Sequence, residues 1–290
     1  DFIKWLCGDH STPECWYMVS HNNVRSGVVA CICNANWTLG SVAHQLHQYL
    51  FYRNKGMYAM ATEDQVRQIW RSADAVSLDV DSTVLTEEAI DELAAYLGVG
   101  QQVQSITNNA MGGAMTYKES LRQRLDIMRP GRQQITRFIT DHPPQLTEGV
   151  RELVERLHER RVPVYLVSGG FTSIIEPIAE ELHIPKENIY ANKLLFYYNG
   201  EYAGFDERQP TCETGGKSKV MELLKHRFGY QRLVHIGDGV TDMEAYPPAD
   251  AFIGFGGNQV RDKVRLGAKW FTTSFHELLD ELHRKMVRMS

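Results

Sequence analysis

The sequence predicts an α/β protein. Its expected core is Rossmann-like, with a parallel sheet between two layers of helices and an α-helical cap domain inserted into it. From Val76 onward, short apolar segments alternate with amphipathic helical patterns, which is typical of parallel strands joined by right-handed crossovers. One long stretch, roughly Thr86 to Leu146, has only helical periodicity. We therefore expect the core at 60–85 and 147–290 and the cap at 86–146.

The composition is that of an ordinary globular protein. With 290 residues, 43% hydrophobic and 23% charged, the chain can bury a large core. A net charge of -5 and a pI near 6.1 provide no basic surface for nucleic acid. The longest apolar stretch near the start, residues 27–33, is far shorter than the roughly 18 to 20 residues that span a bilayer. We expect neither nucleic acid nor a membrane as a partner.

The first 59 residues differ from the rest. They hold four of the five cysteines and show no sustained period. We expect an irregular extension outside the enzyme, because the chain begins at Asp1 whereas Met60 precedes a helix start with Thr62 as N-cap. A targeting peptide is the alternative, but this segment is not Arg-rich and contains acids. Beyond it only Cys212 remains, which excludes a disulfide framework there and favours a reducing, cytoplasmic location.

The first expected strand, residues 75–78 (AVSL), leads directly into residues 79–83 (DVDST). Two carboxylates spaced i, i+2 at the end of a buried strand share one face of it or converge at its mouth. In open α/β sheets, the carboxyl ends of the strands form the ligand crevice. Asp79 and Asp81 therefore predict a site that binds a metal and carries out acid–base or nucleophilic chemistry.

The long insertion that follows has helical patterns at 87–97, 117–128 and 132–140. Because it directly follows the first strand, we expect these helices to form a lid over the mouth of that strand. Further along the chain, residues 196–203 (FYYNGEYA) predict a β-hairpin with an Asn199-Gly200 turn, in which both turn positions need positive φ.

The next expected core strand, residues 162–167, ends on Ser168, Gly169 and Gly170. A hydroxyl group and open backbone N–H groups at the start of a helix suit an anion. Taken alone, the three residues are more typical of a structural turn without a function.

A third expected strand, residues 233–236, leads into residues 237–242 (GDGVTD), and a fourth covers residues 251–253. Asp238 and Asp242 offer the hard oxygen ligands that Mg²⁺ prefers. By itself such a turn is as typical of a helix cap as of a metal site.

The segment 215–218 (GGKS) invites comparison with a phosphate-binding P-loop. That motif requires glycine where Thr211 stands, and no apolar strand leads into the segment, so we reject it. Lys217 can still deliver one positive charge to a phosphate from the start of a helix. The alternative is a solvated surface lysine.

Together these segments have the order and strand placement of the motifs of the haloacid-dehalogenase phosphatases, which the chain resembles. The likeness runs from about Val66 to Leu282 and extends to the family of animal phosphoserine phosphatases. It is carried by residues 79–84 (DVDSTV), 110–114 (AMGGA), 168–171 (SGGF), 200–206 (GEYAGFD), 237–244 (GDGVTDME) and 247–257 (PPADAFIGFGG). The first 59 residues lie outside it.

The resemblance implies Mg²⁺-dependent hydrolysis of O-phospho-L-serine to L-serine and phosphate, the last step of L-serine biosynthesis. Asp79 would form an aspartyl-phosphate, and Asp81 would act as acid and then as base. The carboxylates of Asp79 and Asp238 and the main-chain carbonyl of Asp81 would hold Mg²⁺, with Asp242 bracing its water shell. The phosphoryl oxygens would be held by the groups of Ser168, Gly169, Gly170 and Lys217.

Specificity would come from the cap, because the core motifs would treat any small phosphomonoester alike. By resemblance, Glu88 would bind the substrate ammonium group and Arg124 its carboxylate, a pairing suited to bidentate geometry. Arg124 could instead form a surface salt bridge on an amphipathic helix. The other expected pocket residues are Met111, Gly112 and Thr241. Family members resemble homodimers, so a homodimer is expected.

Two residues depart from the pattern of the family, and two alternative functions remain to be considered. Tyr117 stands where relatives carry phenylalanine, and Ser218 replaces a glycine; neither removes a catalytic group. The enzyme could transfer its phosphoryl group to an alcohol such as homoserine rather than to water. It could also be a catalytically silent binding module, although such a module would usually lose one of the acids Asp79, Asp81 or Asp238.

Overall fold

The structure, a computed structural model, describes residues 4–6, 17–19, 62–111 and 115–283. The chain divides into two units, Asp1–Met60 and Ala61–Ser290. In the first unit, the described part is an antiparallel pair of short strands, β1 (Lys4–Leu6) and β2 (Tyr17–Val19). All other elements belong to the second unit. Among the residues described, no helix is long and apolar enough to cross a membrane.

The second unit is built on a six-stranded, fully parallel sheet with the strand order β10-β9-β8-β3-β4-β5. This arrangement confirms the predicted α/β class. The strands are β3 (Ala75–Leu78), β4 (Val164–Phe171), β5 (Ile189–Asn192), β8 (Leu233–Gly237), β9 (Ala251–Phe255) and β10 (Trp270–Thr272). Strand β3 lies in the middle and is buried on both faces, which explains why Ser77 is its one polar residue.

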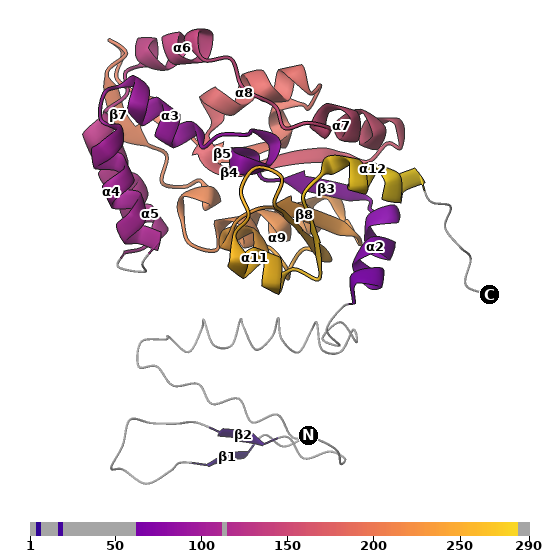
Figure 1. The fold of residues 1–290 in the computed structure, drawn as a ribbon. Helices are drawn as coiled ribbons and strands as arrows, with labels where there is room; N and C mark the ends of the chain where they lie inside the picture. Colours follow the sequence, from indigo (N-terminus) through magenta and orange to yellow (C-terminus); the bar gives the residue numbers. More distant parts are fainter. Residues whose placement is uncertain (1–3, 7–16, 20–61, 112–114, 284–290) are drawn as a thin grey trace, which may run out of the picture. The chain divides into compact units, whose positions relative to one another are not determined.

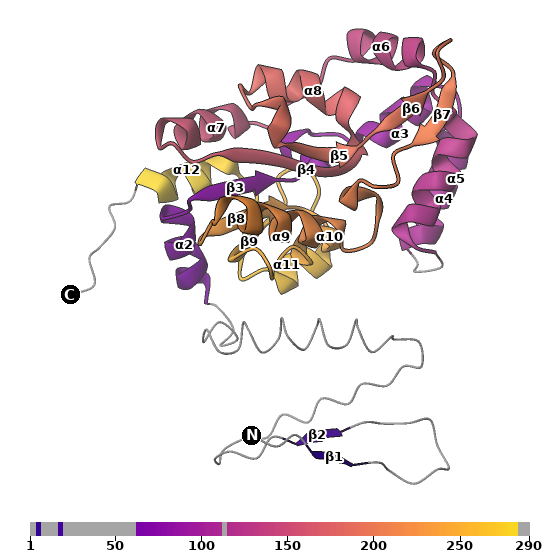
Figure 2. The same cartoon turned by 180° about the vertical axis from the view of Figure 1, so that it is seen from behind.

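Helices cover both faces of this sheet (Figures 1 and 2). The larger apolar cluster joins the sheet to α2 (Glu63–Arg71), α7 (Val150–Glu159), α8 (Thr172–Glu181) and α12 (Phe275–His283). A second cluster joins it to α9 (Gly216–Phe228). The shorter helical segments are α10 (Val240–Met243), α11 (Asp262–Gly267), η2 (Lys186–Asn188) and η3 (Pro210–Cys212).

Helix α2 begins where the sequence predicts. The Thr62 side chain accepts from the Gln65 backbone, and the Gln65 side chain accepts in return from the Thr62 N–H, a capping box. Trp70 is fully buried, and its indole N–H donates to the carbonyl of Leu278 at 3.0 Å. A buried tryptophan therefore keeps its polar group satisfied and ties α2 to α12.

A helical insertion, residues 86–146, interrupts the core between β3 and α7. Backbone hydrogen bonds close its base, from Thr86 N to Gln145 O at 3.0 Å and from Thr147 N to Val84 O at 2.9 Å. Its helices are α3 (Ala89–Tyr96), α4 (Gly100–Met111), α5 (Tyr117–Met128) and α6 (Arg132–Asp141). They have an apolar cluster that includes buried Leu93 and Leu121. Sequence periodicity found three of these helices and missed α4, which opens on a glycine.

The predicted hairpin is present as β6 (Leu194–Phe196) and β7 (Tyr202–Phe205). Its connection differs from the prediction. Gly200 alone of the turn residues has positive φ, 86°, and the loop spans residues 197–201, so it is not a two-residue turn. The Asn199 side chain accepts from the Glu201 N–H at 3.0 Å instead, which stabilises the longer loop.

The register of β3, β4 and β8 determines where the functional residues come together. Leu78 of β3 lies opposite Leu166 of β4 and Ile236 of β8. These three strands therefore end at the same edge of the sheet, and the residues after them face one another. In open α/β sheets this edge is where ligands bind.

Candidate active site

Asp79 directly follows β3 and is almost completely buried, with 7% of its surface exposed. After it the chain makes one wide turn, η1 (Val80–Val84), closed by a hydrogen bond from Leu85 N to Val80 O at 2.8 Å. Within this turn Ser82 has a left-handed φ of 54°, which is unfavourable for serine. The amide of Asn258 fixes the turn by donating to the carbonyls of Ser82 and Leu85, at 3.2 and 3.1 Å.

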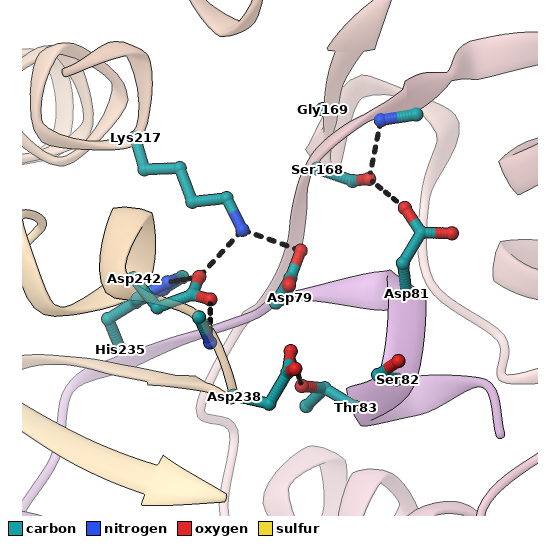
Figure 3. Close-up of polar contacts among 12 residues, drawn as sticks. Asp79, Asp81, Ser82, Thr83, Ser168, Gly169, Lys217, His235, Asp238 and Asp242 are labelled. Carbon is teal, nitrogen blue, oxygen red and sulfur yellow. Dashed lines mark hydrogen bonds and ion pairs between the residues drawn. The ribbon is translucent and has the colours of Figure 1, made fainter. Parts of the chain in front are cut away.

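The ammonium group of Lys217 lies between the carboxylates of Asp79 and Asp242 (Figure 3). Its Nζ lies 2.6 Å from Asp79 Oδ1 and 2.6 Å from Asp242 Oδ1. Burial opposes the charge of this lysine, but the carboxylates of Asp242 and Asp79 outweigh it and raise the pKa of Lys217 above its ordinary value. The lysine is therefore a buried cation, and its interpretation as a solvated surface residue is wrong.

Asp242 is the centre of a buried network. Its Oδ1 also contacts Nε2 of His235 at 2.7 Å, and its Oδ2 accepts from Gly239 N at 2.9 Å. His235 in turn contacts Ser77 Oγ through Nδ1, at 2.8 Å. Burial favours the neutral acid, but Lys217 and His235 outweigh it, so the pKa of Asp242 lies below its usual range. Asp242 therefore fixes Lys217 in place through an ionised carboxylate.

Three buried acids could hold a metal ion. Oxygen atoms of Asp79, Asp238 and Asp242 lie within 4.8 Å of one another. Burial, and then the neighbouring charge of Asp242, raises the pKa of Asp79 well above its ordinary value. Burial likewise raises the pKa of Asp238. Crowded, desolvated carboxylates of this kind suit a hard divalent cation, which would relieve their repulsion.

Asp81 has different surroundings. Its Oδ1 accepts from Ala89 N at 2.9 Å, at the start of α3, and its Oδ2 accepts from Ser168 Oγ at 3.1 Å. Burial, and then the charge of Glu88, raises the pKa of Asp81 to about 6. Ser168 Oγ also accepts from Gly170 N at 2.8 Å. The turn after β3 thus meets β4 directly, and Figure 3 shows the two side chains pointing toward one another. Ser168, Gly169 and Gly170 belong to β4 itself, which extends to Phe171 and so runs further than the sequence predicts.

The helical insertion brings two charged groups. Glu88 accepts from Ser82 Oγ and from Arg261 Nη2, each at 2.9 Å through Oε1. Arg124 lies on α5 and is buried, with 6% exposed. Within the described part of the chain no carboxylate lies within 4 Å of its guanidinium. The charge of Asp91 acts on Arg124, but the two residues form no direct ion pair. A buried cation without a direct ion pair is costly, and such a site is suited to an anionic group of a ligand.

The remaining expected pocket residues are less defined. Thr241 lies exposed on α10, next to Asp242. Met111 is the last residue of α4. Gly112 lies outside the described residues.

Sequence reasoning missed Arg261, at the start of α11. Its Nε donates to Asp238 Oδ2 at 2.7 Å and its Nη2 donates to Glu88 Oε1 at 2.9 Å. It therefore links the acid group of the core to the helical insertion. The one available signal was a basic residue shortly after β9, another strand that ends at this edge.

These features define a class of protein: a three-layer α/β fold with a carboxylate after its central strand, a lysine against it and an acid group beside it. A family model described as haloacid dehalogenase-like hydrolase matches residues 73–250. The curated phosphoserine phosphatase of Mus musculus is 56% identical over 77% of this chain and 99% of its own length. That of Drosophila melanogaster is 45% identical over 86% of this chain and 90% of its own length.

A solved structure described as a phospho-aspartyl intermediate analogue of phosphoserine phosphatase also matches. It has a TM-score of 0.62 and 26% identity, and the match covers 72% of this chain and 98% of that one. The chain belongs to the haloacid dehalogenase-like hydrolases and, within them, to the phosphoserine phosphatase family.

Proposed function

We propose that the chain is a magnesium-dependent phosphatase that hydrolyses O-phospho-L-serine to L-serine and phosphate. The observation that carries this proposal is the convergence of Asp79, Ser168 and Lys217 at the ends of neighbouring elements, with Asp79 Oδ1 only 2.6 Å from Lys217 Nζ. A carboxylate nucleophile and a buried cation at one point are what in-line phosphoryl transfer requires. The family membership supports the choice of substrate.

The reaction would take place in two displacements. Asp79 forms a bond to phosphorus while the bond between phosphorus and the serine oxygen breaks, and Asp81 gives its proton to that oxygen. Water then attacks phosphorus, Asp81 takes up a proton from it, and the bond between Asp79 and phosphorus breaks. The pKa of about 6 suits Asp81 to both tasks near neutral pH.

Ser168, the backbone N–H groups of Gly169 and Gly170, and Lys217 would bind the phosphoryl oxygens as charge shifts onto them. The carboxylates of Asp79 and Asp238 and the carbonyl of Asp81 would hold Mg²⁺. When bound, this cation would screen the negative charges of nucleophile and phosphoryl group from each other.

The helical insertion would act as the cap that selects the substrate. Arg124 would pair with the substrate carboxylate, which explains a buried guanidinium without a direct ion pair. Glu88 would bind the ammonium group, and Met111, Gly112 and Thr241 would complete the pocket. A phosphomonoester that lacks the carboxylate would leave Arg124 unpaired and bind more weakly.

The remaining proposals concern the whole chain. The core would comprise residues 60–85 and 147–290 and the cap residues 86–146, with residues 1–59 outside the enzyme. We propose a cytoplasmic enzyme that functions as a homodimer.

The test is phosphate release by the full chain from L-phosphoserine, phosphothreonine, phosphoglycolate and p-nitrophenyl phosphate, with Mg²⁺ and with EDTA. We expect Mg²⁺-dependent release that strongly favours phosphoserine and is absent in Asp79→Asn. Equal rates on all four substrates would contradict the role of Arg124 and Glu88. Homoserine would be added in a separate reaction. If phosphohomoserine then formed in place of free phosphate, the enzyme would be a transferase.

A further inference from the structure

Tyr117 links the helical insertion to the core. It is the first residue of α5, and its hydroxyl donates to the carbonyl of Gly169 at 2.9 Å. Gly169 follows Ser168 in β4. The approach is so close that a Cβ atom on Gly169 would lie 2.2 Å from Tyr117 Oη. Glycine at 169 therefore makes room for this contact.

The Gly169 carbonyl belongs to a peptide unit that is fixed at both ends. It also accepts from Asn192 Nδ2 at 2.7 Å, and Asn192 is held by Thr211 Oγ1 at 3.0 Å. On the other side of the same peptide, Gly170 N donates to Ser168 Oγ at 2.8 Å. The tyrosine thus reaches the peptide that orients the serine of the phosphoryl site.

Tyr117 also contacts Arg124. The two residues lie two turns apart on α5, and the guanidinium carbon is 5.8 Å from the centre of the phenol ring. Burial raises the pKa of Tyr117, so its hydroxyl stays protonated and can donate. One side chain therefore contacts both the phosphoryl-binding turn of the core and the cation expected to bind the substrate carboxylate.

We infer that Tyr117 is a positioning residue that holds the helical insertion against the Gly169 carbonyl and so sets the distance between the phosphoryl site and Arg124. A substrate that bears both a phosphate and a carboxylate must then fit this distance. The inference rests on the proposed function, because it concerns selection at the same site. The hydroxyl must leave Gly169 whenever the insertion opens for exchange of substrate and product.

The test is Tyr117→Phe, which removes one oxygen and keeps the ring. We expect KM for L-phosphoserine to rise about three- to tenfold, the usual effect of one lost hydrogen bond, while kcat stays within about twofold. KM for p-nitrophenyl phosphate, which has no carboxylate, should rise less.

The matched control is Tyr96→Phe. Tyr96 lies on α3, and its hydroxyl donates to Asp141 Oδ2 at 3.1 Å, so this hydrogen bond stays inside the insertion. The control should behave like the wild type on both substrates. An equal rise in KM for both substrates in Tyr117→Phe, or an unchanged KM for phosphoserine, would overturn the inference.

A second measurement does not depend on substrate. Amide hydrogen exchange in the peptide that contains residues 168–171 should be about three- to tenfold faster in Tyr117→Phe than in the wild type and in Tyr96→Phe. Unchanged exchange would refute the link. If the wild type failed to hydrolyse phosphoserine, the proposed function would fail, while this measurement would still decide whether Tyr117 holds the insertion closed.

Discussion

Lys217 and Asp242 form a buried ion pair with 2.6 Å between Nζ and Oδ1, and the same Nζ lies 2.6 Å from Asp79. The lysine is thus shared between a structural carboxylate and the proposed nucleophile. Because both oxygens of Asp242 already accept hydrogen bonds from His235 and Gly239, this acid is committed to holding the lysine. Asp79 has no such network, which leaves it available to react.

Replacing Asp242 with asparagine should disable the site by freeing Lys217. We expect kcat to fall about 100-fold, the effect of misplacing a catalytic group by about 1 Å. The free energy of unfolding should fall by about 3 kcal/mol because a buried pair is broken. Steady-state kinetics and urea denaturation measure the two effects.

The matched control is Asp250→Asn. Asp250 is buried, and its Oδ1 lies 2.7 Å from Nζ of Lys225. Lys225 lies on α9, as Lys217 does, but it does not contact Asp79 or Asp242. This variant should lose stability and keep its kcat within about twofold. A similar loss of kcat in both variants would show that general destabilisation, rather than the placement of Lys217, explains the effect.

Replacing Arg124 should make the protein more stable but less active on phosphoserine. Because its buried charge forms no direct ion pair among the described residues, Arg124→Met should raise the free energy of unfolding by about 1 kcal/mol. At the same time kcat/KM for phosphoserine should fall about 30-fold or more, since a buried charge pair with substrate is lost. Activity on p-nitrophenyl phosphate should change by less than about threefold. A destabilised variant with normal selectivity would contradict this role.

Magnesium should stabilise the fold without substrate. The acids Asp79 and Asp238 repel each other in a buried site, and a bound cation relieves that repulsion. At about 100 times its Kd, Mg²⁺ should add about 2.7 kcal/mol to the free energy of unfolding, and EDTA should remove the gain. Thermal denaturation at constant ionic strength measures this. The gain should vanish in Asp238→Asn, and its persistence there would place the cation elsewhere.

Acid stability should depend on Glu277 of α12. Although burial opposes its charge, hydrogen bonds from Thr272, Arg67 and Trp270 lower the pKa of Glu277 below its usual 4.5. A carboxyl group whose pKa is lower in the folded state stabilises the fold above its unfolded pKa, and this contribution is lost as the pH falls toward the folded pKa. Melting temperatures of Glu277→Gln should therefore fall less steeply below about pH 4.5 than those of the wild type. If the melting temperatures of the two proteins fell in parallel with pH, Glu277 would not have this role.

The sequence was sufficient for the four central strands β3, β4, β8 and β9, because each carries its own signal, but it missed the edge strands β5 and β10. An apolar segment followed by a polar turn occurs at Asp79, Ser168 and Asp238, and parallel topology alone brings such turns together. Lys217 could be assigned only from the order of the motifs, since no strand precedes it. Its two carboxylate partners, and hence its buried charge, depend on tertiary structure.

What the sequence could not provide were contacts between distant elements. Arg261 reaches Glu88 across 173 positions, and Tyr117 reaches Gly169 across 52. Neither residue has a periodic or local pattern that would mark it. Helix α4 was missed for another reason: it opens on a glycine, a poor helix former, and of its described side chains only Val103 is buried.

The most direct test of the proposed mechanism is to trap the covalent intermediate. The full chain would be mixed with ³²P-labelled L-phosphoserine and Mg²⁺, quenched in acid and digested, and the labelled peptide identified. We expect the label on the peptide that contains Asp79, and no label in Asp79→Asn. In Asp81→Asn the label should appear more slowly, because Asp81 also protonates the departing serine oxygen. Label on a different residue, or phosphate release by Asp79→Asn at the wild-type rate, would contradict nucleophilic catalysis by Asp79.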